Sequence, residues 1–177
     1  MVQQTQLNMK VMKLNKEKLN QILKENIDII EKDLNVYGGP FGAIVVDNDF
    51  NIIGVGWNTV TGSNDPTAHA EVNAIRNACK NLGTFDLTGY SIIATGYPCP
   101  MCLSAIMWAN IKDVYFVSPV EEAQRIGFRD DFIYDTIKLA REGQSLKAIN
   151  IQKVNIKEHE QRMSELYTKY QQSGKMY

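Results

Sequence analysis

The chain has 177 residues, of which 44% are apolar and 22% are charged, as is typical of one soluble globular domain. Its 19 basic and 20 acidic residues give a net charge of −1, which argues against nucleic-acid binding because proteins that grip phosphate backbones usually carry a basic face. No apolar run approaches the length of a membrane span, and the N-terminus lacks the apolar segment of a secretory signal, so we expect a cytoplasmic protein without a membrane anchor.

The N-terminal third predicts one helix followed by a hairpin. A loose tail is expected over residues 1–10, and apolar residues then recur at three- and four-residue steps from Leu19 to Leu34, which indicates an amphipathic helix. A Gly-Gly-Pro tripeptide is expected to end this helix. Two short β-rich runs, Phe41–Val46 and Asn51–Gly56, flank three polar residues and therefore predict a hairpin.

The rest of the chain predicts helices alternating with strands. A second helix is expected to begin with Asp65 as its N-cap and Pro66 at its first position, and to end at Gly83. The later predicted elements are the strand Ser91–Thr95, the helix Pro100–Asn110, the strand Val114–Val117, the helices Glu121–Arg125 and Phe132–Leu139, the strand Ala148–Ile156 and the helix Glu158–Tyr170. This order predicts a single α/β domain over residues 1–177, a three-layer α/β/α sandwich with a mixed sheet of about five strands.

Two cysteines and one histidine form a candidate metal site. Cys99 and Cys102 are three residues apart at a predicted helix start, where unpaired N–H groups favour the thiolate form. Alone, the pair fits a redox dithiol, half of a structural metal site or two ligands of a catalytic metal. His69, near the other predicted helix start, adds a third ligand of the kind that zinc prefers. Three ligands leave a fourth position for water, which predicts one catalytic zinc ion per chain.

Glu71 separates a catalytic site from a structural one. It lies two residues beyond His69, so the two side chains converge only if their helix meets the metal nearly end-on. A carboxylate held beside zinc, but not bound to it, can take a proton from a water whose pKa zinc lowers to about 7. His-x-Glu followed by Pro-Cys-x-x-Cys is the signature of zinc-dependent nucleobase deaminases. The combination therefore predicts a hydrolase that acts on a nucleobase, with Glu71 as the proton carrier.

Longer stretches make the resemblance more specific. The chain resembles the bacterial guanine deaminases, in the cytidine-deaminase-like superfamily, from about Gly38 to Tyr134. The stretches that carry this resemblance are Gly39–Ala43, Ser63–Glu71, Pro98–Cys102, Gly127–Asp130 and Phe132–Tyr134. The resemblance implies a cytidine-deaminase-like fold and the conversion of guanine to xanthine and ammonia in purine metabolism.

The resemblance also implies roles for residues outside the zinc motif. Asp130 would be a second catalytic proton carrier near the exocyclic amine, and Asn58 would hydrogen-bond the purine through an amide that offers both a donor and an acceptor. A C-terminal segment over about residues 155–177 would cross to the partner subunit of a homodimer and close its site. The implied substrate-binding residues are Asn58, Phe41, Ala70, Trp108 and Tyr177.

Two positions depart from that resemblance and leave the exact substrate open. Tyr97 stands where the family usually has Glu, and Arg129 replaces an acid beside Asp130, although neither residue is a predicted zinc ligand. The alternative enzymes are a tRNA adenosine deaminase, which shares the zinc motif, and a deaminase of free cytosine, a pterin or a triazine. The non-enzyme alternative is a binding module with a structural zinc, and Glu71 argues against it.

Overall fold

The computed structural model describes residues 16–32, 37–142 and 157–172. The chain divides into two compact units, the first running up to Ile133 and the second starting at Tyr134. No helix within the described ranges combines the length and the apolar character that crossing a membrane requires. The sheet and every described residue of the candidate site belong to the first unit.

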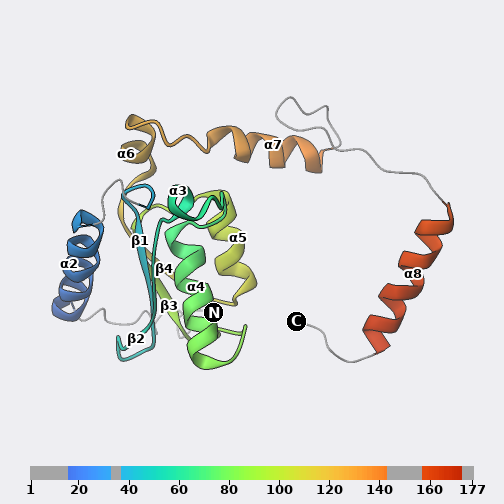
Figure 1. Ribbon diagram of the computed structural model, residues 1–177, viewed down its shortest axis with the longest axis horizontal. Helices are drawn as coiled ribbons and strands as arrows, with labels where there is room; N and C mark the ends of the chain where they lie inside the picture. Colours follow the sequence, from blue (N-terminus) through green and yellow to red (C-terminus); the bar gives the residue numbers. More distant parts are fainter. Residues whose placement is uncertain (1–15, 33–36, 143–156, 173–177) are drawn as a thin grey trace, which may run out of the picture. The chain divides into compact units, whose positions relative to one another are not determined.

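Four strands form a mixed sheet in the order β2-β1-β3-β4 (Figure 1). The strands are β1 (Gly42–Val46), β2 (Ile52–Trp57), β3 (Ser91–Gly96) and β4 (Asp113–Ser118). β1 pairs antiparallel with β2 and with β3, whereas β3 and β4 are parallel. This arrangement confirms the predicted mixed sheet and the α/β class. The further strand predicted over 148–156 lies outside the described residues.

Helices cover both faces of this sheet, which confirms the predicted three layers. Figure 1 shows α2 on one side of the strands and α4 and α5 on the other. The helices of the first unit are α2 (Lys16–Lys32), α3 (Val60–Ser63), α4 (Ala70–Leu82), α5 (Pro100–Trp108), α6 (Val120–Arg125) and the start of α7 (Asp131–Arg141). In the second unit α8 spans Lys157–Gln172. The short α3 was not predicted, because four residues are too few to show a periodic pattern.

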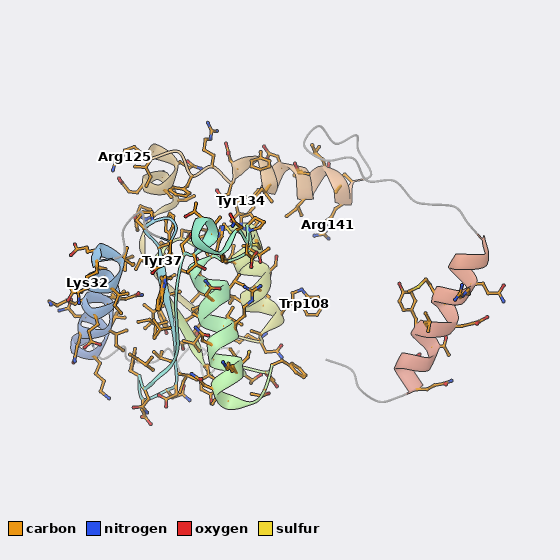
Figure 2. The ribbon with its side chains drawn as sticks, in the orientation of Figure 1. Lys32, Tyr37, Trp108, Arg125, Tyr134 and Arg141 are labelled. Atoms are coloured by element: carbon orange, nitrogen blue, oxygen red, sulfur yellow. The ribbon has the colours of Figure 1, made fainter. Side chains whose placement is uncertain are left out.

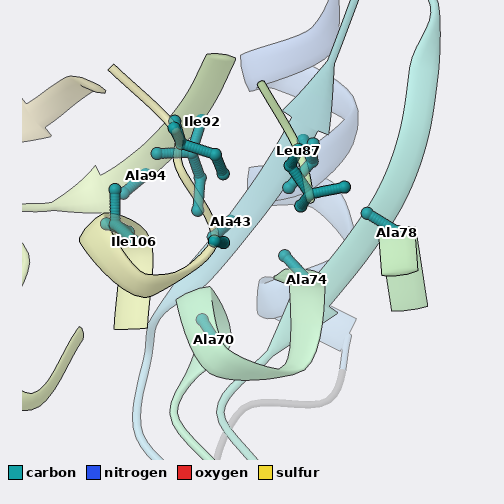
Figure 3. Packing of buried hydrophobic residues seen from close by; sticks show 11 residues of the cluster. Ala43, Ala70, Ala74, Ala78, Leu87, Ile92, Ala94 and Ile106 are labelled. Carbon is teal, nitrogen blue, oxygen red and sulfur yellow. The ribbon is translucent and has the colours of Figure 1, made fainter. Parts of the chain in front are cut away.

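The alternation of side chains along β1 explains the two covered faces. Ala43 and Val45 pack into a cluster with the alanines of α4, as Figure 3 shows for Ala43. Ile44 and Val46 point the other way, into a second cluster with Ile22 of α2. Successive strand residues point to opposite faces, so a strand that is buried throughout must be covered on both sides. The apolar run in β1 is thus the sequence signal of a central strand.

The structure corrects the predicted start of the second helix. Asp65 does not cap it, because its Oδ1 accepts hydrogen bonds from the backbone N–H of Thr67 at 2.8 Å and from the Thr67 hydroxyl at 2.7 Å, closing a separate turn. The helix α4 begins at Ala70, with His69 in extended backbone as its N-cap, and it ends at Gly83 as predicted. With this start, His69 lies directly at the N-terminal end of α4. α5 begins as predicted, with Cys99 as N-cap and Pro100 in the first turn.

Candidate active site

The N-terminal ends of α4 and α5 bring the three predicted metal ligands together. His69 and Cys99 occupy the two N-cap positions, and Cys102 lies in the first turn of α5. The Sγ atoms of Cys99 and Cys102 each lie 3.6 Å from Nδ1 of His69. All three ligand atoms lie within 4.8 Å of one another. A single ion can therefore touch all three.

The spacing of these atoms fits zinc. Zinc binds sulfur at about 2.3 Å and imidazole nitrogen at about 2.05 Å, so two such ligands at a tetrahedral angle stand about 3.6 Å apart. This matches both observed sulfur–nitrogen distances. Within the described ranges, no fourth histidine, cysteine or acidic side chain joins the group. The donor set therefore suits a tetrahedral ion with one position left for a water or a substrate atom.

The pKa values of the two thiols are shifted in opposite directions. The pKa of Cys99 is lowered to about 4, first because the Cys102 thiol hydrogen-bonds to it and then because His69 lies beside it, although burial opposes the shift. The hydrogen bond to Cys99 also keeps the proton on Cys102 and raises its pKa. Contact with the Cys99 sulfur in turn raises the pKa of His69. One thiolate is thus present before an ion arrives, and binding of a dication would release the remaining ligand protons.

Glu71 lies beside this cluster in the first turn of α4. Its side chain is only 8% exposed, and burial is the main cause of its raised pKa. Its Oε2 lies 3.4 Å from the Sγ of Cys102. His69 and Glu71 both line one cavity, so they converge as the end-on arrangement requires. A buried carboxyl group next to a metal site, but outside its ligand cluster, suits a proton carrier.

A cavity of about 750 Å³ opens over the cluster. Its lining includes His69, Glu71 and Cys99, and much of the rest is apolar. Phe41 and Phe128 lie in this lining with ring centroids 5.0 Å apart and nearly perpendicular planes. A volume in the range of small-molecule sites, with aromatic walls and a few polar groups, suits a flat heterocyclic ligand.

Asn58 lines the same cavity and is held in one orientation. It follows β2 directly and is 6% exposed. Its Oδ1 accepts hydrogen bonds from the backbone N–H groups of Gly39 at 3.1 Å and Val60 at 3.2 Å. A Cβ on Gly38 would stand 2.1 Å from this oxygen, so the close approach requires glycine. With Oδ1 occupied, the Asn58 amide offers a ligand its N–H groups, which narrows the predicted donor-and-acceptor role to that of a donor.

Residues 16–118 of the chain match the cytidine and deoxycytidylate deaminase zinc-binding region. The chain belongs to this family of zinc-dependent deaminases. Membership and the fitting donor set together confirm the predicted cofactor, one zinc ion per chain. They also confirm the prediction that the protein is a deaminase, a hydrolase that acts on C–N bonds.

The deaminase is similar to proteins of two named activities. It is 48% identical to the guanine deaminase of Bacillus subtilis (strain 168) over 122 residues, which are 69% of this chain and 76% of that protein. The X-ray structure of guanine deaminase from Bacillus subtilis matches with a TM-score of 0.74 at 41% identity, covering 84% of this chain and 93% of that chain. A tRNA-specific adenosine deaminase of Haemophilus influenzae is 42% identical over 96 residues, 54% of this chain and 56% of that protein. The predicted resemblance and the cytidine-deaminase-like fold are confirmed.

Asp130 and Asp131 are adjacent in the deaminase but differ in their surroundings. Asp130 lines the cavity, and its pKa is raised by burial and by the negative charge of Cys99. Asp131, its neighbour, instead forms an exposed ion pair with Arg129 and has a lowered pKa for that reason. Arg129, which stands where the family resemblance implies an acid, thus pairs with Asp131. Asp130 remains directed to the cavity as a candidate proton carrier.

Two predicted base-contacting residues of the deaminase lie elsewhere. Trp108 is the last residue of α5, is 71% exposed and projects outward (Figure 2), so it is not a wall of this cavity. Ala70 is fully buried in the core under α4, and its side chain does not line the cavity. Phe41 does line it as predicted. Tyr177 lies outside the described residues.

The cavity wall contains functional candidates that were not predicted as site residues. Phe128 lies in the quoted Gly-Phe segment, but it is separated in sequence from every ligand, so only the fold shows that it faces Phe41. Tyr97 lines the cavity just before the cysteine motif, and its ring packs edge-on against Phe116 with centroids 5.0 Å apart. The sequence did contain a signal for this residue, because Tyr97 departs from the family pattern at that position.

Proposed function

We propose that this deaminase hydrolyses guanine to xanthine and ammonia. The observation that carries the proposal is a buried Glu71 beside a His-Cys-Cys cluster, in the lining of a cavity that also contains aromatic residues. The relative named guanine deaminase supports guanine as the base, because its similarity extends over 76% of that protein. Similarity to the tRNA-specific relative covers only 56% of that protein.

The catalytic chemistry follows from what Glu71 can do next to the ion. His69, Cys99 and Cys102 would hold zinc. When bound, zinc would act as a Lewis acid that lowers the pKa of a water to about 7. Burial raises the pKa of Glu71, which makes this carboxyl group better suited to both accept and return a proton. Glu71 accepts a proton from the attacking water and delivers it to the ring nitrogen beside C2.

The second half of the reaction expels ammonia. The bond from C2 to the water oxygen has formed, and the bond from C2 to the exocyclic nitrogen must break. The second proton of the water passes to the amine through Glu71 or Asp130, both of which line the cavity. One proton of the water thus ends on xanthine and the other on ammonia, which balances the reaction.

Base recognition is assigned to four other residues that line the cavity, Asn58, Phe41, Phe128 and Tyr97. Asn58 would donate its amide N–H groups to an acceptor on the purine edge, since its oxygen is already bonded to Gly39 and Val60. Phe41 and Phe128 would contact the flat ring. Tyr97 would contact the ring edge from the wall, where its phenol replaces the carboxylate that the family usually carries.

The active enzyme is proposed to be a homodimer in the cytoplasm. The segment over about residues 155–177, with Tyr177, would reach the partner's site, as the family resemblance implies. In the first unit Trp108, Phe116 and Val117 are exposed apolar residues of the kind that an interface covers. The free thiols of the ligand set favour a reducing compartment. Sedimentation analysis at several concentrations tests the dimer, and a monomer at all of them would contradict it.

A substrate panel tests the proposed reaction. Zinc-loaded protein is assayed for ammonia and for product with guanine, adenine, cytosine, a pterin, a triazine and a tRNA anticodon stem-loop that carries adenosine. We expect xanthine from guanine with the highest kcat/KM of the set. Inosine formation in the tRNA with no xanthine from guanine would instead assign the chain to the tRNA deaminases.

A further inference from the structure

Three asparagines of α4 bind the edge of the sheet in a regular ladder. The Nδ2 groups of Asn73, Asn77 and Asn81 donate to the backbone carbonyls of Trp57 at 2.9 Å, Val55 at 2.8 Å and Ile53 at 2.8 Å, respectively. Four helical residues rise about 6 Å and two strand residues about 6.6 Å, so the two repeats stay in register. β2 is at one edge of the described sheet, and the ladder occupies carbonyls that would otherwise be open.

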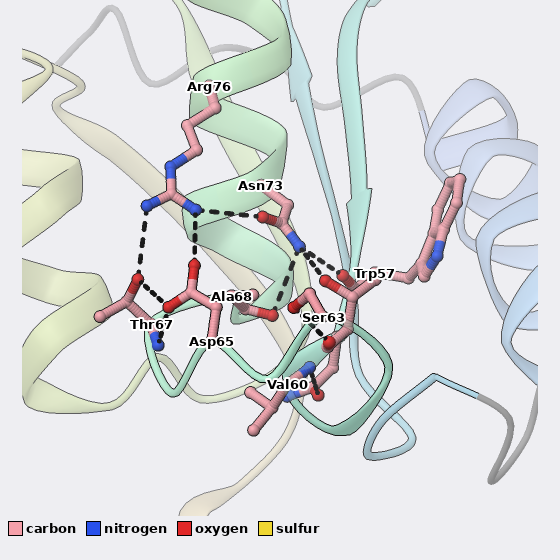
Figure 4. A network of polar contacts seen from close by, with 10 residues as sticks. Trp57, Val60, Ser63, Asp65, Thr67, Ala68, Asn73 and Arg76 are labelled. Carbon is pink, nitrogen blue, oxygen red and sulfur yellow. Dashed lines mark hydrogen bonds and ion pairs between the residues drawn. The ribbon is translucent and has the colours of Figure 1, made fainter.

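The first rung of this ladder makes contacts that the other two lack. The Nδ2 of Asn73 also lies 3.1 Å from Thr59 Oγ1 and 3.3 Å from the carbonyl oxygen of Ala68 (Figure 4). Its backbone N–H donates to the carbonyl of His69 at 2.9 Å. Asn73 thus binds the peptide groups on both sides of the ligand His69.

The oxygen of the Asn73 amide faces Arg76, on the side away from the three acceptors. This Oδ1 accepts a hydrogen bond from Arg76 Nη1 at 3.5 Å. Arg76 in turn donates to Thr67 Oγ1 at 3.3 Å and pairs with Asp65 at 3.6 Å (Figure 4). The guanidinium therefore holds the oxygen of the amide, and the N–H groups face the three acceptors.

We infer that Asn73 is a positioning residue, which sets His69 relative to Asn58 and thereby the geometry of both the metal centre and the base site. Its three acceptors belong to the end of β2, the turn after Asn58 and the residue before His69. The backbone N–H of Thr59 also donates to the Ala68 carbonyl at 3.0 Å. The side-chain amide of Asn73 therefore adds to an existing contact between the segment after Asn58 and the segment before His69. In the described part of the chain, the side chains of Asn77 and Asn81 donate to β2 alone. The link to base binding depends on the proposed function, whereas the link to the metal does not.

Matched substitutions on neighbouring rungs separate positioning from edge closure. Asn73→Ala and Asn77→Ala each remove one bond to β2, so both are expected to lower the unfolding temperature. In the zinc-loaded full chain, only Asn73→Ala should lower kcat with guanine, by about 10- to 100-fold, since displacements of about 1 Å in a catalytic arrangement have effects of this size. Asn77→Ala should keep wild-type kcat and KM.

Two metal readouts do not depend on the identity of the substrate. Asn73→Ala should release zinc to a chelator faster than wild type by about tenfold, and it should shift the visible absorption bands of the cobalt-substituted protein. Asn77→Ala should change neither. Altered metal readouts in a chain that does not act on guanine would support the positioning role and refute the proposed function. Equal zinc release, equal cobalt spectra and equal kcat for the two variants would overturn the inference.

Further variants keep the test decisive if Asn73→Ala does not fold. Asn73→Asp keeps the shape but removes the donors, and Asn73→Gln restores a primary amide on a longer arm, so Gln should recover part of the metal retention that Asp loses. Thr59→Val removes one acceptor with little change of shape and should shift zinc release in the same direction by a smaller factor. A Thr59→Val protein with a wild-type release rate, together with no recovery by Gln, would also overturn the inference.

Discussion

The two faces of the sheet are packed in different ways. On the α4 face, a Cβ at Gly54 would stand 2.5 Å from the Ala74 carbonyl oxygen, and one at Gly56 would stand 2.3 Å from that of Ala70. Helix and strand backbones therefore touch directly. On the α2 face the contacts run through larger side chains, which are Ile22, Ile44, Val46, Phe50 and Ile93.

Because of this difference, we expect the α4 face to determine the position of the site and the α2 face to contribute to stability only. Backbone atoms in contact cannot be displaced by rotating a side chain, so the α4 face allows one helix position, and that helix carries His69 and Glu71. Side chains on the α2 face can adopt other rotamers and absorb small changes. We therefore expect substitutions at Gly54 and Gly56, where the α4 and β2 backbones touch, to affect turnover, and changes on the α2 face to affect stability alone.

The largest expected effect is the loss of turnover on replacing Glu71. Glu71→Gln keeps the shape but removes the proton carrier, so kcat should fall by at least about 10²- to 10⁴-fold while zinc stays bound. The matched control is Glu25→Gln, an exposed glutamate of α2 that accepts a bond from Gln21. It should leave kcat unchanged. Wild-type turnover in the Glu71→Gln protein would refute the role of this carboxyl group.

The next effect is the loss of metal on removing a thiolate. Cys99→Ala takes away the thiol with the lowered pKa, so the zinc content should fall well below one ion per chain, and turnover with it. Cys79→Ala is the control, because Cys79 packs against the core from α4 and burial raises its pKa. Full zinc occupancy in the Cys99→Ala protein, measured by elemental analysis, would show that the ligand set is wrong.

A pair of core substitutions tests the two faces most directly. Gly56→Ala places a methyl group 2.3 Å from backbone atoms of α4, so it should lower the free energy of unfolding by about 1–3 kcal/mol and also lower kcat. Ile44→Val on the other face should lower that free energy by about 0.5–1.5 kcal/mol and leave kcat unchanged. Denaturant unfolding and steady-state kinetics measure both. If the two variants lost kcat equally, the faces would not differ in function.

The sequence predicted the parts of the site that chemistry restricts to few residue types. Zinc sites use few side-chain types, so His69, Cys99 and Cys102 were found from their residue types, their spacing and the predicted helix starts. Most strands followed from their apolar runs. Contacts that depend on tertiary register were not accessible. Asn73 looks like any polar helix residue until α4 is aligned with β2, and Trp108 proved to be exposed because α5 presents its last residue outward. Asp65 failed as a helix cap because its own side chain closed a local turn first.

The smallest effect concerns a buried amide on the α2 face. Asn26 is 1% exposed, and neither Oδ1 nor Nδ2 has a hydrogen-bond partner in the part of the chain that the structure describes. Asn26→Leu keeps the branched shape and removes both polar atoms, so it should raise the free energy of unfolding by about 1 kcal/mol. Asn26→Asp should lower it, because burying an unpaired carboxylate is more costly than burying an amide.

Neither change at Asn26 should alter kcat in the folded protein, since the side chain packs between α2 and β1, where a Cβ on Gly42 would lie 2.3 Å from its oxygen. A loss of stability in the Asn26→Leu protein would mean that the amide binds a partner such as an ordered water. A loss of kcat without a loss of stability would show that the α2 face also places the site, and the contrast between the two faces would fail at that point.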